Sequence, residues 1–370
     1  MNTPRTIRAC GFACAAFLWL LPTFGLGAYQ PGLGGGGDVS GQQPPEPSPA
    51  KKERQGGPER KPAALSGGEV SLKPKFAPGT VLRYELSQST RQRNRAPSMS
   101  EMDGEMRLDQ TLNLVMNVSK ADEGAGSTVE VTVERVRLSI DAEGLRAQAD
   151  TRQAKPGGPA SPRTSEDAAD KELRERLERV AGEMASEKMT FTLDARGNIV
   201  RVTGGDKLAG GALLAAVAGV PTTSGAGPLS LSPAGGSGAG GGAVQWLVGG
   251  VAGQPDVVRP GSTWTNRDLL GRTPVGDLVL QTQHKVKSVR AGNAEVTFAG
   301  SVEPSPDQSK SSAPVTVDRA NYSGDYLWNG DAGRLERMAA DLSTHMTVDL
   351  SGSKVESEST TTMKVERKER

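Results

Sequence analysis

The sequence predicts an α+β fold that is mostly β, with a long, curved antiparallel sheet resembling a half-barrel and one or two helices packed on it. Three observations lead to this prediction. Apolar and polar residues alternate with period two in many segments, one segment has the 3.6-residue period of an amphipathic helix, and short turn-forming stretches separate the alternating segments. Repeated alternation is typical of antiparallel strands that bury one face.

The N-terminal residues have the pattern of a secretory signal peptide. Arg5 and Arg8 precede an apolar run from Ala9 to Leu21, and small residues follow up to Ala28. The run is shorter than the ~20 residues that a membrane helix needs. We therefore expect residues 1–28 to be removed, no transmembrane anchor to remain, and the protein to be exported, either periplasmic or secreted.

Composition limits the chemistry of the mature chain. Cys10 and Cys14 both lie in the predicted signal, so disulfides, thiolate metal sites and cysteine nucleophiles are not expected. The 44 basic and 43 acidic residues nearly balance, which gives no footprint for nucleic acid. The only histidines, His284 and His345, are too few for a histidine-rich metal site. We predict no metal site and no cofactor.

Residues 29–73 are rich in Gly, Pro, Gln, Lys and Glu and poor in apolar residues. Such a segment has too little apolar surface to offset the entropy lost on ordering. We interpret it as a disordered tether, with a Pro-rich partner-binding motif as the alternative. A β-rich domain over 74–370 is expected to follow.

The clearest strand signal begins at Glu105. One parity is apolar apart from Gln110, and its members are Met106, Leu108, Leu112, Leu114, Met116 and Val118. At ~3.3 Å per residue this strand would be about 43 Å long, so it must twist and bend within a large sheet. In the next segment the apolar parity changes at Glu134 and Arg135, which predicts a β-bulge.

Similar alternation recurs almost to the C-terminus and is separated by turn signals. The predicted hairpin connections are Asp141–Gly144, Asp194–Gly197, Arg290–Asn293 and Asp331–Gly333. Glu356 and Glu358 share one parity of a late segment, where they are interpreted as part of a solvated edge strand.

One helix is predicted after Ser165, because Leu173, Leu177, Val180, Ala181 and Met184 recur at helical spacing. It is expected to cover a face of the sheet. A second candidate helix, Lys207 to Val220, is too short to span a bilayer. Residues 221–253 are Gly-, Ser- and Pro-rich and are predicted to be a flexible insertion, although they contain Trp246 and Leu247.

The predicted β-rich domain, residues 74–370, also contains a weak internal repeat. Phe76 to Tyr84 has a counterpart in Val258 to Trp264, and in both a Pro-Gly pair opens a strand. The repeat predicts two related units, about 74–203 and 257–370, in one sheet or in two adjoining sheets.

Three stretches carry a resemblance to a known family: Pro260 to Trp264, Tyr326 to Asn329 with Gly333 to Leu335, and Phe191 to Gly197. Residues 74–370 resemble an uncharacterised family of exported bacterial β-rich proteins. That resemblance implies no catalytic residues. More distantly, the architecture resembles the half-barrel of periplasmic lipoprotein carriers, in which a curved sheet wraps helices and holds acyl chains.

Few side chains suggest chemistry. His345 lies on a polar parity and is expected to be solvated, whereas His284 is in phase with apolar residues and is expected in the core or lining a cavity. The aromatic residues Tyr84, Trp264, Tyr326 and Trp328 are interpreted as closing the ends of the core, with a carbohydrate platform as the alternative.

These patterns favour a non-enzymatic exported binding module for an amphiphilic or lipid-like ligand. The alternative is a structural or protein-interaction module of the cell envelope whose core is filled, and an unrecognised hydrolase is a third reading. The expected partner is accordingly a lipid or amphiphile, or an envelope protein, and not nucleic acid. The candidate lining residues of the ligand face are Met106, Leu108, Leu112, Leu114, Met116, Leu177 and His284.

Overall fold

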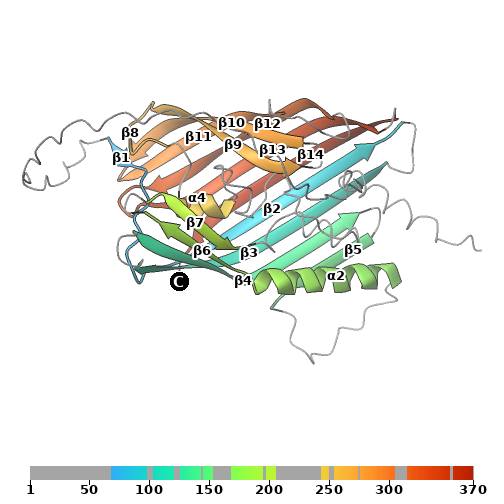
Figure 1. The fold of residues 1–370 in the computed structure, drawn as a ribbon, viewed down its shortest axis with the longest axis horizontal. Coiled ribbons are helices and arrows are strands. Elements are labelled where there is room, and N and C mark those ends of the chain that lie inside the picture. The colour runs from blue at the N-terminus through green and yellow to red at the C-terminus, as the bar shows by residue number, and fades with distance from the viewer. Residues whose placement is uncertain are drawn as a thin grey trace, which may run out of the picture.

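The computed structural model describes residues 68–97, 103–120, 126–142, 145–152, 168–194, 197–205, 243–249, 254–273, 276–304, 315–350 and 353–369. These residues form one 12-stranded antiparallel sheet, a two-stranded sheet and two helices (Figure 1). The prediction of a mostly β fold built on one long antiparallel sheet is confirmed.

The elements have the following bounds. The two-stranded sheet pairs β1 (Val70–Ser71) with β8 (Val257–Val258). The helices are α2 (Ala168–Ala185) and α4 (Ala243–Gly249). The large sheet contains β2 (Val81–Arg95), β3 (Gly104–Lys120), β4 (Ser127–Ala142), β5 (Leu145–Asp150), β6 (Lys188–Leu193), β7 (Ile199–Gly204), β9 (Thr263–Thr273), β10 (Gly276–Arg290), β11 (Asn293–Pro304), β12 (Val315–Asn329), β13 (Arg334–Leu350) and β14 (Ser353–Lys368).

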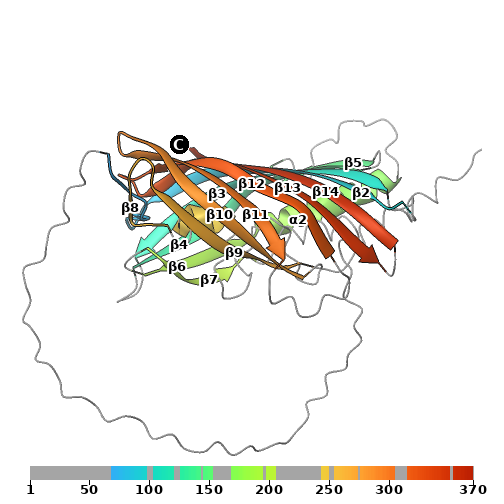
Figure 2. The same cartoon turned by 90° about the horizontal axis from the view of Figure 1, so that it is seen from above.

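The order of strands across the large sheet is β7, β6, β4, β3, β2, β14, β13, β12, β11, β10 and β9, with β5 paired to β4. The sheet is open, with β7 and β9 at the two ends of this path, and it curls around the side on which α4 lies (Figures 1 and 2). Strands from both predicted units join in one sheet, because β14 pairs with β2. Glu356 and Glu358 are exposed as expected, but β14 is an interior strand and not an edge strand.

The long strand predicted from Glu105 to Ser119 is β3. Its apolar parity is buried from Leu108 to Val118, with side chains at most 7% exposed. The predicted bulge is confirmed in β4, where Asn113 pairs with Arg135 and Leu114 pairs with Val133. Glu134 is therefore the extra residue, and both halves of β4 point their apolar side chains to the same face.

The predicted hairpins connect β4 to β5, β6 to β7, β10 to β11, and β12 to β13. In the β10–β11 turn, Ala291 and Gly292 both have positive φ, 47° and 74°. Two consecutive positive φ values match the twist of the flanking strands, which is why tight hairpins use them.

The repeated Pro-Gly motif forms the same turn twice. The Gly79 N–H donates to the Val118 carbonyl at 2.8 Å, and the Gly261 N–H donates to the Val286 carbonyl at 2.9 Å. Both glycines have a φ of 85°. The local structural equivalence agrees with the sequence repeat, while the division into two related units remains a prediction.

The predicted amphipathic helix is α2, which lies against β4 and β5. Its apolar side chains Leu173, Leu177, Val180, Ala181 and Met184 are at most 8% exposed. Leu138 and Ile140 of β4 are buried in the same core. Since Leu138 is paired with Gln110 and Ile140 with Leu108, these side chains share one face of the sheet, and α2 covers that face.

Two boundaries differ from the sequence expectation. Val70 and Leu72, placed in the tether, are 2% and 0% exposed, because β1 pairs with β8 and the Leu72 N–H donates to the Asp256 carbonyl. Residues 243–249, placed in the flexible insertion, form α4, and Leu247 is 0% exposed. The glycine-rich flanking residues made this short apolar helix difficult to predict. Its contact with the sheet stabilises it, because so short a helix is not stable in isolation.

Several expectations lie outside the described residues. These are the signal at 1–28, the tether from 29 to 67, the candidate helix Lys207 to Val220, and the insertion at 221–242 and 250–253. Among the helices that the structure does describe, none combines the length and apolar character needed to cross a membrane.

Candidate ligand-binding face

We call the concave side of the large sheet, on which α4 lies, the inner face. Because directly opposite residues on antiparallel strands point to the same side, the register defines which side chains belong to it. Leu112 lies opposite Leu86, Leu114 opposite Tyr84, and Met116 opposite Leu82. All six side chains are at most 5% exposed.

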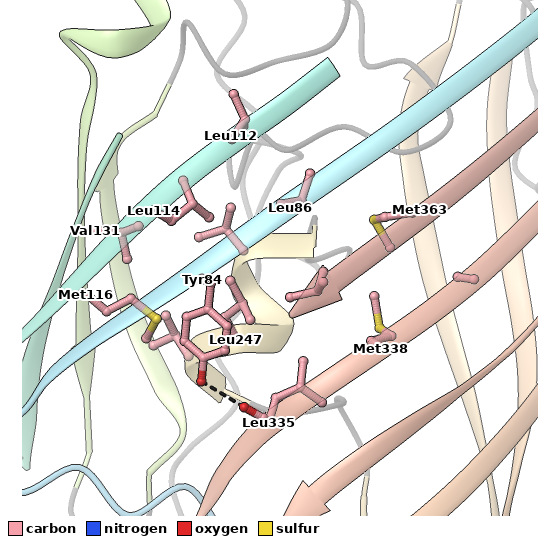
Figure 3. Packing of buried hydrophobic residues seen from close by; sticks show 14 of the residues in the cluster. Tyr84, Leu86, Leu112, Leu114, Met116, Val131, Leu247, Leu335, Met338 and Met363 are labelled. Atoms are coloured by element: carbon pink, nitrogen blue, oxygen red, sulfur yellow. Dashed lines mark hydrogen bonds between the residues drawn. The ribbon is translucent and has the colours of Figure 1, made fainter. Parts of the chain in front are cut away.

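Helix α4 closes one end of the inner face. Val244, Leu247 and Val248 are at most 1% exposed, and Leu247 lies near Tyr84 and Leu335 (Figure 3). The Tyr84 hydroxyl donates to the Leu335 carbonyl at 2.9 Å. Burial raises the pKa of Tyr84, so the phenol stays protonated. This end is a packed apolar core in which the buried Tyr84 hydroxyl has a hydrogen-bond partner.

A polar belt crosses the same inner face beyond the α4 end. It consists of side chains with hydroxyl or amide groups on four adjacent strands: Gln88, Thr90, Gln92, Asn94, Gln110, Thr344, Ser357, Ser359 and Thr361. Thr361 lies opposite Thr90, and Ser359 lies opposite both Gln92 and Thr344. The belt is therefore continuous from β3 across β2 and β14 to β13.

Part of the polar belt is satisfied internally. Thr90 and Thr361 share a hydrogen bond at 3.1 Å, and the Gln92 amide donates to Asn94 Oδ1 at 3.0 Å. Gln110 Nε2 and Ser357 Oγ are buried and have no hydrogen-bond partner among the described residues. Most buried polar atoms in proteins are paired with protein groups or with ordered water, so these two atoms are available to a water molecule or to a polar group of a ligand.

An aromatic cluster occupies the inner face on β9 to β12. It consists of Trp264, His284, Phe298, Tyr322 and Tyr326, with Trp246 of α4 packed edge-on against Phe298. Trp264 stacks on His284 with ring centroids 5.0 Å apart and planes 6° apart.

His284 lies at the centre of this aromatic cluster. Its side chain is 0% exposed, and Nε2 is 3.2 Å from Thr282 Oγ1. Burial lowers the pKa of His284 to about 4, because charging the imidazole would require desolvation of an ion. The imidazole is therefore neutral at physiological pH.

The structure places the seven predicted lining residues in four regions. Leu112, Leu114 and Met116 lie at the α4 end, and Met106 and Leu108 lie beside the polar belt, where Met106 faces Gln92. His284 lies in the aromatic cluster, on the other arm of the sheet. Leu177 lies on α2, over β4 and β5, and is 0% exposed. All seven belong to the inner side, but they do not form one site.

The polar belt went unrecognised in the sequence apart from Gln110. Its signal was present, because the parity of Tyr84 and Leu86 continues through Gln88, Thr90, Gln92 and Asn94. In the sequence, polar residues on the buried side of a strand cannot be distinguished from polar residues on its exposed side. Only the pairing of β2 between β3 and β14 shows that they point inward.

The fold and this face define an open, half-barrel-like sheet with a partly polar interior. No family model and no curated protein matches the chain. The resemblance to an uncharacterised exported family therefore stays a prediction.

Solved structures give weak similarities. Lipovitellin aligns with 12% identity and a TM-score of 0.41 over 80% of this chain, which spans only 26% of the lipovitellin chain. DynF from the dynemicin biosynthesis pathway of Micromonospora chersina aligns with 9% identity over 83% of this chain and 92% of its own, at a TM-score of 0.18. An outer membrane channel from Pseudomonas putida F1 aligns with 10% identity over 82% of this chain and all of its own (100%), at a TM-score of 0.19.

Proposed function

We propose that the chain is an exported, non-enzymatic binding module that holds an amphiphile on its inner face. One observation carries the proposal. The inner face joins apolar side chains to a polar belt in which Gln110 Nε2 and Ser357 Oγ are buried without partners among the described residues.

The energetics of these two atoms favour a ligand over a simply filled core. Leaving a buried donor or acceptor unpaired costs about 1–3 kcal/mol, so a face filled only by protein would be more stable with apolar residues there. A ligand that brings a polar group to Gln110 and Ser357 removes this cost.

Buried apolar side chains lie beside the belt, where they would contact the apolar part of a ligand. Leu108 and Leu112 flank Gln110 on β3, and Met363 lies opposite Gln88. Burial of roughly eight methylenes would contribute about 6 kcal/mol. An amphiphile can therefore satisfy both parts of the face, whereas a purely polar ligand would leave the apolar part unused.

A second candidate function is a structural or protein-interaction module of the envelope with a filled core. It is favoured by the two helices, since α2 and α4 both bury apolar side chains against the inner face. In that case the unpaired belt atoms would be a cost to stability with no compensating ligand.

Replacement of one unpaired amide separates these two functions. Gln110→Leu should weaken binding of 1-decanol about fivefold if the amide meets the ligand, because one hydrogen bond is lost. Displacement of the fluorescent probe N-phenyl-1-naphthylamine measures this affinity. Gln148→Leu, the same change on an exposed position of β5, is the matched control and should leave the affinity unchanged. Failure of 1-decanol to bind the wild-type protein would favour the filled module.

A further inference from the structure

The aromatic cluster contains three polar atoms that the described residues leave without a hydrogen-bond partner. They are Trp264 Nε1, His284 Nδ1 and Tyr326 OH. The same residue types are satisfied at the α4 end, where Tyr84 donates to the Leu335 carbonyl and Trp328 donates to the Ser71 carbonyl at 3.1 Å. The unpaired atoms are thus a property of this cluster and not of aromatic residues throughout the core.

Trp264 and Tyr326 both contact the imidazole ring of His284. Trp264 stacks on the His284 ring, and the Tyr326 ring centroid is 6.2 Å from that of His284. The contact between His284 Nε2 and Thr282 leaves Nδ1 as its unpaired ring atom. Tyr326 is 2% exposed, so its hydroxyl is also removed from bulk water.

The hydrogen-bonding groups of Trp264 and Tyr326 determine which kind of ligand atom can pair with them. An indole N–H can only donate a hydrogen bond, while a phenol can donate or accept. An oxygen acceptor is therefore the group that satisfies Trp264 and can satisfy Tyr326 as well. Aromatic faces around it favour an apolar body next to that oxygen.

The cluster also selects against charge. All six of its side chains are uncharged at neutral pH, since burial holds the pKa of His284 at about 4. A carboxylate or ammonium group placed here would lose its hydration without gaining a counter-charge from the cluster.

We propose that the aromatic cluster binds an uncharged, oxygen-bearing group of the ligand, such as an ester, ketone or hydroxyl, through Trp264 and Tyr326. This proposal rests on the proposed function, because it places a group of the same amphiphile on the same inner face. It identifies the ligand class as neutral lipids in preference to free fatty acids.

Three probes of matched chain length test the assignment on the full chain: methyl decanoate, decanoate and undecane. Their affinities are measured by displacement of N-phenyl-1-naphthylamine at neutral pH. Methyl decanoate should bind about tenfold more tightly than either of the others, because only it combines an oxygen acceptor with no charge. Tyr326→Phe and Trp264→Phe should each weaken methyl decanoate about fivefold and leave undecane unchanged.

Tyr84→Phe is the matched control, because it removes a hydroxyl that already has a partner on the same inner face. It should not change the preference for the ester. Thermal melting supplies a second readout: Tyr326→Phe should not lower the melting temperature of the free protein, since its hydroxyl is buried without a partner, whereas Tyr84→Phe should lower it.

The outcomes distinguish this inference from the proposed function. If none of the three probes binds, amphiphile binding itself fails, and the inference with it. If all three bind equally, or if Tyr326→Phe and Tyr84→Phe weaken methyl decanoate equally, amphiphile binding stands and the assignment to the aromatic cluster is overturned.

Discussion

Arg135 and Asp150 hold the bulged part of β4 against the end of β5. Arg135 Nε donates to Asp150 Oδ1 at 2.9 Å, and Nη2 donates to Oδ2 at 2.5 Å. The hydrogen bonds from Arg135 lower the pKa of Asp150 against the opposing effect of burial. This two-point contact fixes the residue next to the bulge at Glu134.

Asp150→Asn should therefore destabilise the protein in a pH-dependent way. A carboxyl with a lowered pKa contributes stability that is complete above its unfolded-state pKa, about 3.9, and that is lost as the pH falls through the lower folded-state value. Urea unfolding at a series of pH values measures the difference between wild type and variant. The difference should be largest near neutral pH and shrink below about pH 4. A difference that stays constant over this range would show that Asp150 acts only through its shape.

Gly324 makes room for Phe298 in the aromatic cluster. A Cβ built on Gly324 would lie 2.5 Å from Phe298 Cζ and 2.1 Å from the Ala339 carbonyl oxygen. Gly324→Ala should cost roughly 1–3 kcal/mol of unfolding free energy through overpacking. Gly182→Ala is the opposite case, since nothing lies within 4 Å of its Cβ and it is in α2.

Gly182→Ala, which serves as the control, should stabilise the protein by about 0.5–1 kcal/mol, because alanine loses less conformational entropy than glycine when a helix forms. Chemical denaturation of both variants tests the pair. Equal effects of the two substitutions would mean that the space at Gly324 does not limit the cluster.

At the scale of single residues, the sequence predicts well which side chains are buried. The phase of His284 predicts a position in the core or lining a cavity, and Tyr326 is predicted to close an end of the core; the structure buries both side chains. The sequence does not predict which polar atoms find partners, because pairing depends on strands that are distant in the chain. Tyr84 and Leu335 are an example, since they are joined only by the order of the sheet.

Among the elements, α4 shows where local sequence patterns fail. Seven residues between glycine-rich stretches are too few to form a stable helix in isolation. Their apolar side chains gain burial against the inner face, which the sequence window does not contain. In contrast, α2 and β3 were predicted from their own periodicity because they are long and strongly amphipathic.

Leu247→Ala measures how firmly α4 is held. If Leu247 is packed at the α4 end as described, the substitution should cost roughly 2–5 kcal/mol, the usual range for a buried leucine. Val200→Ala, at a 61% exposed position of β7, should change stability by no more than about 0.5 kcal/mol. Equal, small effects in a denaturant titration would instead fit the flexible segment that the sequence indicated.

For the whole molecule, the join between β14 and β2 turns two halves into one curved inner face. The alternation in the sequence predicts a long antiparallel sheet, and the repeated Pro-Gly turn indicates two similar halves. Neither pattern predicts which strands become neighbours. The sequence therefore suggests an edge position for β14, although the strand lies in the interior of the sheet. The continuity of the polar belt depends on this join, since the belt crosses from β2 to β14.

The central claim is that this inner face holds an amphiphile whose polar group meets the buried, unpaired atoms. Organic extraction of protein purified from its native host, followed by quantitative mass spectrometry, tests it most directly. We expect an amphiphile, uncharged in its oxygen-bearing part, in near-stoichiometric amount, and a reduced amount from Gln110→Leu. An extract without any stoichiometric amphiphile would contradict the claim and leave the filled interaction module as the function of this fold.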